Sequence, residues 1–297
     1  MLIACCTFLM KILQHAGYDS HQNFLNWHRQ RVNLFLHLAM EKVSVVSFTN
    51  YADSVKKALN DAGAASVLAG QSRILIKPNL VDDIPFPVTT PVECSAAIID
   101  YIRSVSNAEI IVAEGSGGEK PTTEVFMKLG YARLAEAKQV RLVDLNEEPL
   151  IRLENPGCKV FREYYIPEIA MEYFIISVPV LKAHSFSIVT LSLKNMMGFA
   201  PPSCYQVGGF WKKSFFHNRM HESIIEMNLY RMADLTLIDA TVGMPDYHLG
   251  GRHCDPPVNK LIASFDALEA DKTGAGLLGF DWRKIDHLAK FKRINDS

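Results

Sequence analysis

Short runs rich in Val, Ile and Leu alternate with segments of helical pattern from about Met40 onward. Seven runs are expected as strands, at residues 43–48, 73–77, 109–113, 140–145, 173–178, 235–240 and 261–265. Helices are expected between them, at residues 51–62, 91–105, 123–137, 221–232 and 267–278. Strands that alternate with helices form βαβ units, whose strands run parallel and whose helices cover the sheet. The sequence therefore predicts an α/β fold, with a mostly parallel sheet and helices on both faces.

Two stretches interrupt this alternation. Residues 146–170 are expected as short, partly antiparallel strands around Asn155-Pro156-Gly157, and residues 198–220 as a long loop rich in Gly, Pro and aromatic residues. Neither stretch has the character of a linker between independent cores. We therefore expect residues 40–297 to form a single α/β domain with an inserted flap or loop region.

Residues 1–39 differ from the rest of the chain, since they show neither strand alternation nor a sustained amphipathic helix. Two interpretations stay open: an irregular N-terminal extension outside the native domain, with Met40 as the true start, or a helical extension that packs on the domain. The first predicts that deletion of residues 1–39 leaves thermal unfolding nearly unchanged.

The balance of charges and the cysteine spacing narrow the class of protein. With 31 Lys plus Arg and 32 Asp plus Glu, the net charge is -1, so no global field attracts nucleic acid or an anionic membrane. The six cysteines form no C-x-x-C pair, so the chain carries no iron-sulfur cluster motif, and scattered thiols of this kind favour the cytoplasm. The apolar residues 2–13 are interrupted by Lys11 and are shorter than the roughly 18 residues of a membrane span.

Polar side chains gather where the expected strands end. In an open parallel sheet, ligands bind beyond the carboxyl ends of the strands, so these residues should share one cleft. They are Lys77 and Asn79 after the second strand, Glu114, Gly115 and Gly117 after the third, Lys182 and His184 after the fifth, and Asp239 in a later one. Lys194 and Asn195 follow in an apolar context.

This set of residue types favours a small anionic ligand, a carboxylate or a phosphate. Lys77, Lys182 and Lys194 could converge on one anion, with Asn79 and Asn195 as further donors. Repulsion between such lysines would lower a lysine pKa, which suits a catalytic base or a Schiff-base lysine.

Particular roles follow for individual residues. The catalytic candidates are His184, as acid-base group, Lys182 and Lys194; the ligand-binding candidates are Lys77, Asn79, Glu114, Gly115, Gly117, Asn195 and Asp239. The glycines after Glu114 would let backbone amides approach the anion. Lys194 and Asn195 should begin or border a helix whose amino end points into the cleft.

Alternatives to this hypothesis remain open on sequence grounds. His217 and His221 lie one helical turn apart, and Glu114, His184 and Asp239 could together hold a divalent ion, but neither set identifies a metal. The aromatic and basic residues of 205–219 suit either single-stranded nucleic acid or, better, a hinged lid. The sequence does not distinguish an enzyme from a non-catalytic binding or scaffold protein, and it identifies neither a cofactor nor an oligomeric state.

Several motifs together resemble one protein family. They are Lys77-Pro-Asn79, Thr89-Thr-Pro91, Pro179-x-x-Lys182-x-His184, Thr190-Leu-Ser-Leu-Lys194-Asn195-x-x-Gly198, Asp239 and Asp266-x-x-x-x-Asp271. Over residues 43–288 the chain resembles domain-of-unknown-function family 362, a largely uncharacterised family. Members often carry an iron-sulfur label because a ferredoxin-type module is attached, which this chain lacks. The family is also distantly similar to the amino-terminal domain of nickel-dependent lactate racemases, an analogy that suits an anion-binding cleft.

The chain departs from the family pattern at two places. A longer and bulkier segment, residues 244–251, follows Asp239, and Ala267 stands where a Pro commonly follows the first Asp of the last motif. Both departures affect what the resemblance implies about the substrate more than what it implies about the fold.

Overall fold

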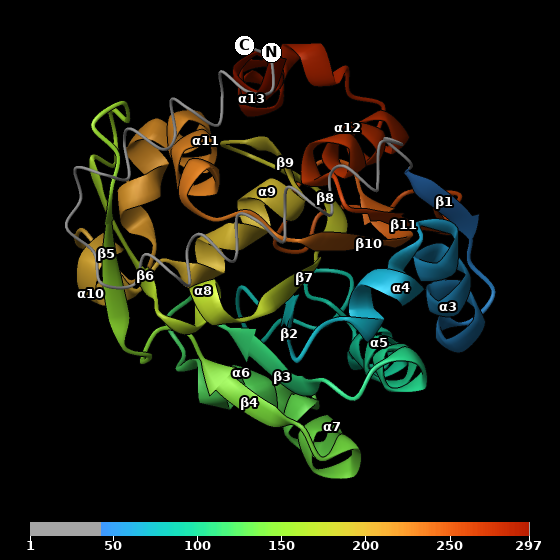
Figure 1. Ribbon diagram of the computed structural model, residues 1–297. Coiled ribbons are helices and arrows are strands. Elements are labelled where there is room, and N and C mark those ends of the chain that lie inside the picture. The colour runs from blue at the N-terminus through green and yellow to red at the C-terminus, as the bar shows by residue number, and fades with distance from the viewer. Residues whose placement is uncertain (1–42, 297) are drawn as a thin grey trace. The chain divides into compact units, whose positions relative to one another are not determined.

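The computed structural model describes residues 43–296 (Figure 1). The expectations for residues 1–39 and for Met40 as a start lie outside the described residues. Within these residues the main sheet has nine strands, of which seven follow the order β1-β11-β10-β7-β2-β3-β4. The seven are β1 (Ser44–Ser47), β2 (Arg73–Pro78), β3 (Glu109–Glu114), β4 (Arg141–Asp144), β7 (Phe174–Val178), β10 (Leu235–Met244) and β11 (Lys260–Ser264). The other two are β8 (Val180–His184), which pairs with β10, and β9 (Ile188–Thr190), which pairs with β8.

The sheet is mostly parallel, as the sequence predicts, but it is mixed. The pairs β10/β7, β7/β2, β2/β3 and β3/β4 are parallel, whereas β11 runs antiparallel to both β1 and β10, and β9 runs antiparallel to β8. β11 runs antiparallel to β10 because a loop joins the two strands, whereas a parallel pair would need a crossover connection such as a helix.

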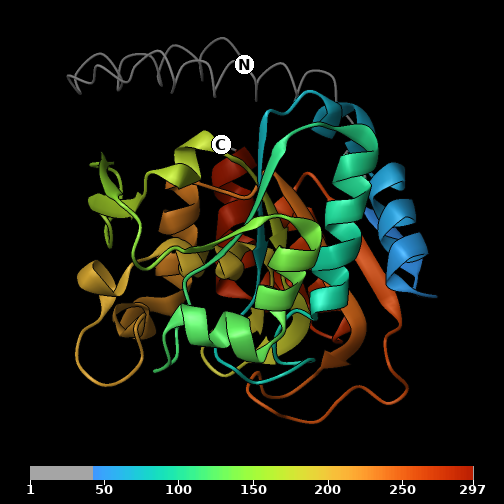
Figure 2. The ribbon, with the colours of Figure 1, turned by 90° about the horizontal axis from the view of Figure 1, so that it is seen from below.

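Helices cover both faces of the sheet (Figures 1 and 2). One face carries α3 (Tyr51–Asp61), α4 (Ala64–Ala69), α5 (Val92–Val105), α6 (Thr122–Lys128) and α7 (Tyr131–Lys138). The other carries α9 (Ser192–Asn195), α11 (Met220–Tyr230), α12 (Ala267–Leu277) and α13 (Asp286–Asp296). The central strands are therefore buried on both sides, which explains their continuous apolar sequence.

The helix expected at residues 123–137 is two helices. Gly130 separates α6 from α7 with a φ of 84°, a left-handed conformation that glycine adopts without a steric penalty. The helical pattern continues across this residue, so periodicity alone did not reveal the break.

Residues 146–170 contain the antiparallel pair that the sequence predicts. β5 (Leu150–Glu154) and β6 (Glu163–Pro167) form a two-stranded sheet of their own, and α8 (Ile169–Glu172) follows. Glu226 of α11 anchors the turn, since its carboxylate accepts hydrogen bonds from the backbone amides of Lys159, Val160 and Phe161 at 2.7 to 2.8 Å. The stretch 198–220, expected as a loop, holds short helical turns, namely η1 (Met196–Phe199), α10 (Pro202–Tyr205) and η2 (Ser214–Arg219).

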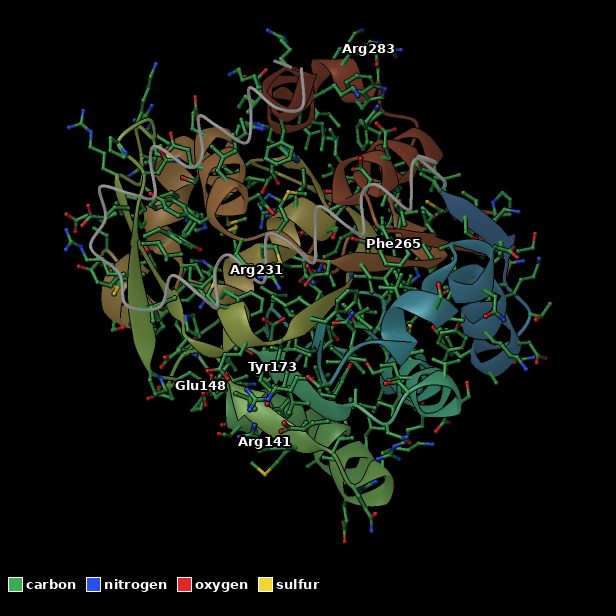
Figure 3. All side chains as sticks on the ribbon, in the orientation of Figure 1. Arg141, Glu148, Tyr173, Arg231, Phe265 and Arg283 are labelled. Atoms are coloured by element: carbon green, nitrogen blue, oxygen red, sulfur yellow. The ribbon has the colours of Figure 1, made fainter. Side chains whose placement is uncertain are left out.

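Arg231 is a fully buried charge just after α11. Figure 3 shows it within the body of the domain, whereas Arg283, in η3 (Trp282–Lys284), extends from the rim. The Arg231 guanidinium donates to the carbonyl oxygens of Ala170 at 2.8 Å and Tyr173 at 2.9 Å, and it pairs with Asp234 at 2.6 Å. A buried charge of this kind is tolerated because each donor has an acceptor. Among residues 43–296, no helix is long and apolar enough to cross a membrane.

Candidate functional site

A cavity of about 210 Å³ lies at the carboxyl ends of β2, β3 and β8. Nine of the ten residues proposed from the sequence line it: Lys77, Asn79, Glu114, Gly115, Gly117, Lys182, His184, Lys194 and Asn195. They come from strand ends that are distant in the sequence and adjacent in the sheet, as the parallel topology requires.

Asp239 lies outside this cavity. Its carboxylate accepts hydrogen bonds from the Tyr51 hydroxyl at 2.7 Å and from the backbone and side chain of Thr241 at 3.0 and 2.7 Å. The expectation failed because β10 does not end near Asp239 but continues to Met244. Asp239 is therefore a mid-strand residue, and burial raises its carboxyl pKa.

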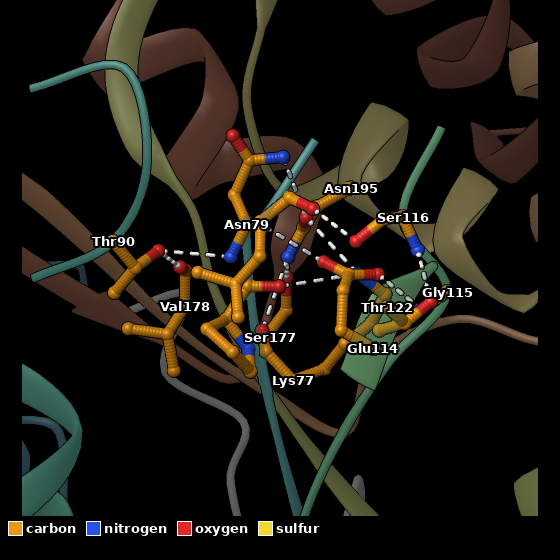
Figure 4. A network of polar contacts seen from close by, with 12 residues as sticks. Lys77, Asn79, Thr90, Glu114, Gly115, Ser116, Thr122, Ser177, Val178 and Asn195 are labelled. Atoms are coloured by element: carbon orange, nitrogen blue, oxygen red, sulfur yellow. Dashed lines mark hydrogen bonds and ion pairs between the residues drawn. The ribbon is translucent and has the colours of Figure 1, made fainter. Parts of the chain in front are cut away.

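An ion pair between Lys77 and Glu114 forms the floor of the site (Figure 4). The Lys77 Nζ lies 2.8 Å from Glu114 Oε1, with both side chains buried, and it also donates to Asn195 Oδ1 at 3.2 Å and to the Pro78 carbonyl at 3.2 Å. Glu114 in turn accepts the amides of Gly115 at 2.8 Å and Leu80 at 3.0 Å. All three protons of the Lys77 ammonium are thus used within the protein.

Asn195 ties this pair to the neighbouring strands (Figure 4). Its Nδ2 donates to the Lys77 carbonyl at 3.2 Å and to Ser177 Oγ at 3.0 Å, while its Oδ1 also accepts from Asn79 Nδ2 at 3.2 Å. A fully satisfied buried network of this kind fixes the side chains that line the cavity.

Gly198 brings its backbone against the ion pair. A Cβ at this position would lie 2.1 Å from Glu114 Oε1 and 2.5 Å from Lys77 Nζ, so only glycine fits. Gly115 is similarly restricted, since its Cβ would lie 2.4 Å from the Gly198 carbonyl oxygen.

The amides of Gly115, Gly117 and Gly118 already donate within the protein, which differs from the expectation for the glycine-rich turn. The Gly115 amide donates to its neighbour's carboxylate, and the amides of Gly117 and Gly118 both donate to the Val81 carbonyl, at 3.1 and 2.9 Å. The turn packs against Val81 because the carbonyl oxygen of this residue, distant in the sequence, accepts both amides. Gly115 and Gly117 contribute surface to the cavity rather than hydrogen bonds.

Two further lysines are buried and partly bonded. Lys182 donates to Asn79 Oδ1 at 2.7 Å and to the Val88 carbonyl, and Lys213 donates to Asn146 Oδ1 and the Ala200 carbonyl. Burial lowers the pKa of each to about 7, with the charge of Lys194 adding to the effect on Lys182. Lys213 is not among the residues predicted from the sequence, because it follows no strand. It belongs to the aromatic and basic loop at residues 205–219, for which the sequence favours a lid.

Lys194 differs from the other three lysines. Its ammonium makes no hydrogen bond or ion pair with any residue from 43 to 296, yet it lines the cavity. Burial, followed by the nearby charge of Lys77, lowers the pKa of Lys194 to about 8.

The helix that carries Lys194 does not point its amino end into the cavity, contrary to the sequence prediction. Lys194 and Asn195 end the short helix α9, and the amides at its start, Ser192 and Leu193, donate to the Asp271 carboxylate at 2.7 and 2.9 Å. Asp271 comes from α12, far along the chain, and it satisfies the donors that a ligand would otherwise use.

His184 is fixed as a neutral hydrogen-bond donor. Its Nδ1 accepts from the amides of Phe186 at 3.0 Å and Ser187 at 3.3 Å, which leaves the proton of the neutral ring on Nε2. Burial, then the charge of Lys194, lowers the pKa of His184 far below its ordinary range, so the expected titration near neutral pH is not supported.

His248 stacks on the His184 ring, with centroids 3.9 Å apart. Its Nδ1 is buried without a partner among residues 43–296, and burial lowers its pKa to about 3. His248 belongs to the segment where the chain departs from the family pattern, and the sequence gave no signal for its role at the cavity.

The metal hypotheses find no support in the part of the chain that the structure describes, where no group of three His, Cys, Asp or Glu could hold an ion. His217 lines the cavity, but His221 turns to His287, with 3.0 Å between the two Nδ1 atoms. Asp239 lies apart from Glu114 and His184, as described above.

Comparison with protein families identifies the family of this chain. The model of a family described as a domain of unknown function (DUF362) matches residues 74–276, well over half of the chain. The chain belongs to the DUF362 family. No curated protein matches it.

Three of the motifs by which the sequence resembles DUF362 meet at the cavity. Lys77-Pro-Asn79, Lys182-x-His184 and Lys194-Asn195-x-x-Gly198 all supply lining residues, and Asp271 of the last motif caps the helix that carries Lys194. Thr89-Thr-Pro91 and Asp239 supply no lining residue, and the Asp239 carboxylate accepts a hydrogen bond from the Tyr51 hydroxyl instead. These three motifs of the DUF362 domain thus gather at one cavity.

Proposed function

We propose that the domain binds a small anion, a carboxylate or a phosphate, in this cavity. The observation that carries the proposal is an imbalance of charge. Among the described residues that line the cavity, Lys77, Lys182, Lys194 and Lys213 are basic and Glu114 alone is acidic. Since Glu114 is paired with Lys77, an anion would supply the missing partner for the other lysines.

The donors that remain support the same ligand. The Lys194 ammonium offers three N–H donors. Lys182 and Lys213 each use two of their three N–H donors within the protein, which leaves one on each for a ligand. His184 adds its Nε2–H. The cavity is smaller than the roughly 300–1,000 Å³ of clefts that hold drug-sized molecules, which favours a small ligand.

The segment 206–219 serves in this proposal as a lid. It supplies Trp211, Lys213 and His217 to the cavity wall, and Gly208 and Gly209 adopt φ values of 68° and 67° beside the exposed Phe210. Hydrogen exchange tests this: phosphate should slow the exchange of amides in 206–213, whereas unchanged exchange would indicate a fixed wall.

The alternative functions rest on weaker observations. A non-catalytic binding protein would use the same cavity, and a saturable ligand without turnover would favour it. An iron-sulfur-associated redox function rests on the family label alone, because the sequence has no C-x-x-C pair. No nucleic acid or membrane partner is proposed. We assign a cytoplasmic location on the thiols of Cys94, Cys158, Cys204 and Cys254, all of which are free.

Calorimetric titration with inorganic phosphate tests the proposal on the parent protein and on Lys194→Met. Methionine keeps most of the apolar stem and removes an ammonium that has no described partner, so the fold should survive. Phosphate affinity should fall about tenfold or more, which corresponds to about 1.4 kcal/mol.

The matched control is Lys56→Met, which removes an exposed lysine of α3 and should leave phosphate affinity unchanged. Asp239→Asn should also leave it unchanged, because Asp239 lies outside the cavity. If the parent binds no phosphate and no small carboxylate, the proposal fails. If Lys194→Met unfolds as readily as a core truncation, Lys194 has a structural role instead.

A further inference from the structure

Lys194 is chemically distinct from the other lysines of the cavity. Lys77 has three acceptors, and Lys182 and Lys213 each have two, so their nitrogens are held in place as hydrogen-bond donors. No described residue holds the Lys194 nitrogen, which leaves it able to move toward a bound molecule.

From this arrangement we infer that Lys194 is a nucleophilic amine that forms a Schiff base with a small carbonyl compound bearing a carboxylate or phosphate group. The inference rests on the proposed function, since the anionic group of the substrate would be held by Lys182, Lys213 and His184. It goes further by naming the substrate class and the atom that attacks, Lys194 Nζ.

The surroundings supply the free amine that this chemistry requires. Burial and the positive charge of Lys77 lower the pKa of Lys194 to about 8, so about a tenth of its amine is neutral at pH 7. An ordinary exposed lysine is almost entirely protonated at that pH. A desolvated lysine beside other cations is an established means of activating an amine.

The covalent step balances without any further reactant. The neutral Nζ attacks the carbonyl carbon, and one of its protons passes to the oxygen to give a carbinolamine. The second N–H proton leaves with the hydroxyl group as water while the C=N bond forms. Solvent then protonates the imine nitrogen to give the iminium ion, so no oxidant, reductant or metal is needed.

Reductive trapping tests the inference on the whole chain. The protein is incubated with pyruvate and sodium cyanoborohydride, which reduces an imine to a stable secondary amine, and the modified lysines are located by peptide mass mapping. The adduct should form on Lys194 well before it forms on exposed lysines such as Lys56. Inorganic phosphate, which has no carbonyl group, should compete and slow the labelling.

The outcomes separate this inference from the proposed function. Labelling of Lys182 or Lys213 ahead of Lys194, or equal labelling of exposed lysines, would overturn the inference. If phosphate binds but no adduct forms on Lys194, the inference fails and the proposed function stands. If the parent binds neither phosphate nor a small carboxylate, the proposed function fails. Lys194→Met, shown to be folded by circular dichroism, should lose the fast adduct, and the parent result decides the question even if that variant does not fold.

Discussion

Gly198→Ala tests the reasoning about the floor of the cavity most directly. The added Cβ would lie 2.1 Å from Glu114 Oε1 and 2.5 Å from Lys77 Nζ, well inside van der Waals contact. Both atoms belong to the buried ion pair, so the methyl group must separate the charges or shift the 3-10 turn that carries Gly198.

The cost follows from the two events that can occur. Overpacking a rigid core costs about 1–3 kcal/mol, and breaking a buried ion pair costs about 3–5 kcal/mol. We therefore expect Gly198→Ala to lower the free energy of unfolding by about 3 kcal/mol, or the melting temperature by roughly 6–12 °C for a domain of this size. Phosphate affinity should fall as well, because the displaced Lys77 and Glu114 form part of the cavity wall.

The matched control is Gly276→Ala in α12. An added Cβ there meets no atom within 4 Å, so the substitution should stabilise the helix by about 0.5–1 kcal/mol. Urea unfolding of the parent and both variants supplies the measurement. The reasoning is refuted if Gly198→Ala stays within about 1 kcal/mol of the parent, since the ion pair would then tolerate the methyl group.

Two further predictions concern protonation and the hairpin. Before an anion binds, the pKa of Lys182 and Lys213 is about 7 and that of Lys194 about 8, and a bound anion raises each pKa. Phosphate should therefore bind with proton uptake above pH 7, and its affinity should fall as the pH rises. Calorimetry at pH 8.5 in buffers of different ionisation enthalpy measures the uptake, and a finding of no uptake would contradict the prediction. Glu226→Ala leaves three backbone amides without their acceptor, so urea unfolding should show a loss of about 2–3 kcal/mol while phosphate affinity stays the same; an unchanged unfolding free energy would show that water replaces the carboxylate.

The sequence was a good guide wherever a local pattern decides the structure. Alternating strands and helices predicted the parallel part of the sheet, and polar residues after strands predicted that Lys77, Glu114, Lys182 and His184 would meet. The antiparallel β1/β11 edge was not predictable in the same way, because a strand's direction depends on the connection before it.

The features of the site that the sequence did not predict depend on contacts between distant parts of the chain. Asp271 reaches α9 from a helix almost 80 residues later, and only the fold shows that it takes the amides expected to face a ligand. Lys213 and His248 come from irregular segments, where no periodicity indicates which way a side chain points. His184 lines the cavity as predicted, but burial lowers its pKa below the range that the sequence analysis expected, and a sequence does not report burial.

The order in which the cavity wall is synthesised has a consequence for folding. Its residues come from several separate segments between Lys77 and Leu249. During translation, Lys77 and Glu114 leave the ribosome long before Asn195 and Gly198, which enclose them. The two charges therefore stay hydrated until the second half of the sheet docks, and a nascent chain that stops before Asn195 should bury neither of them.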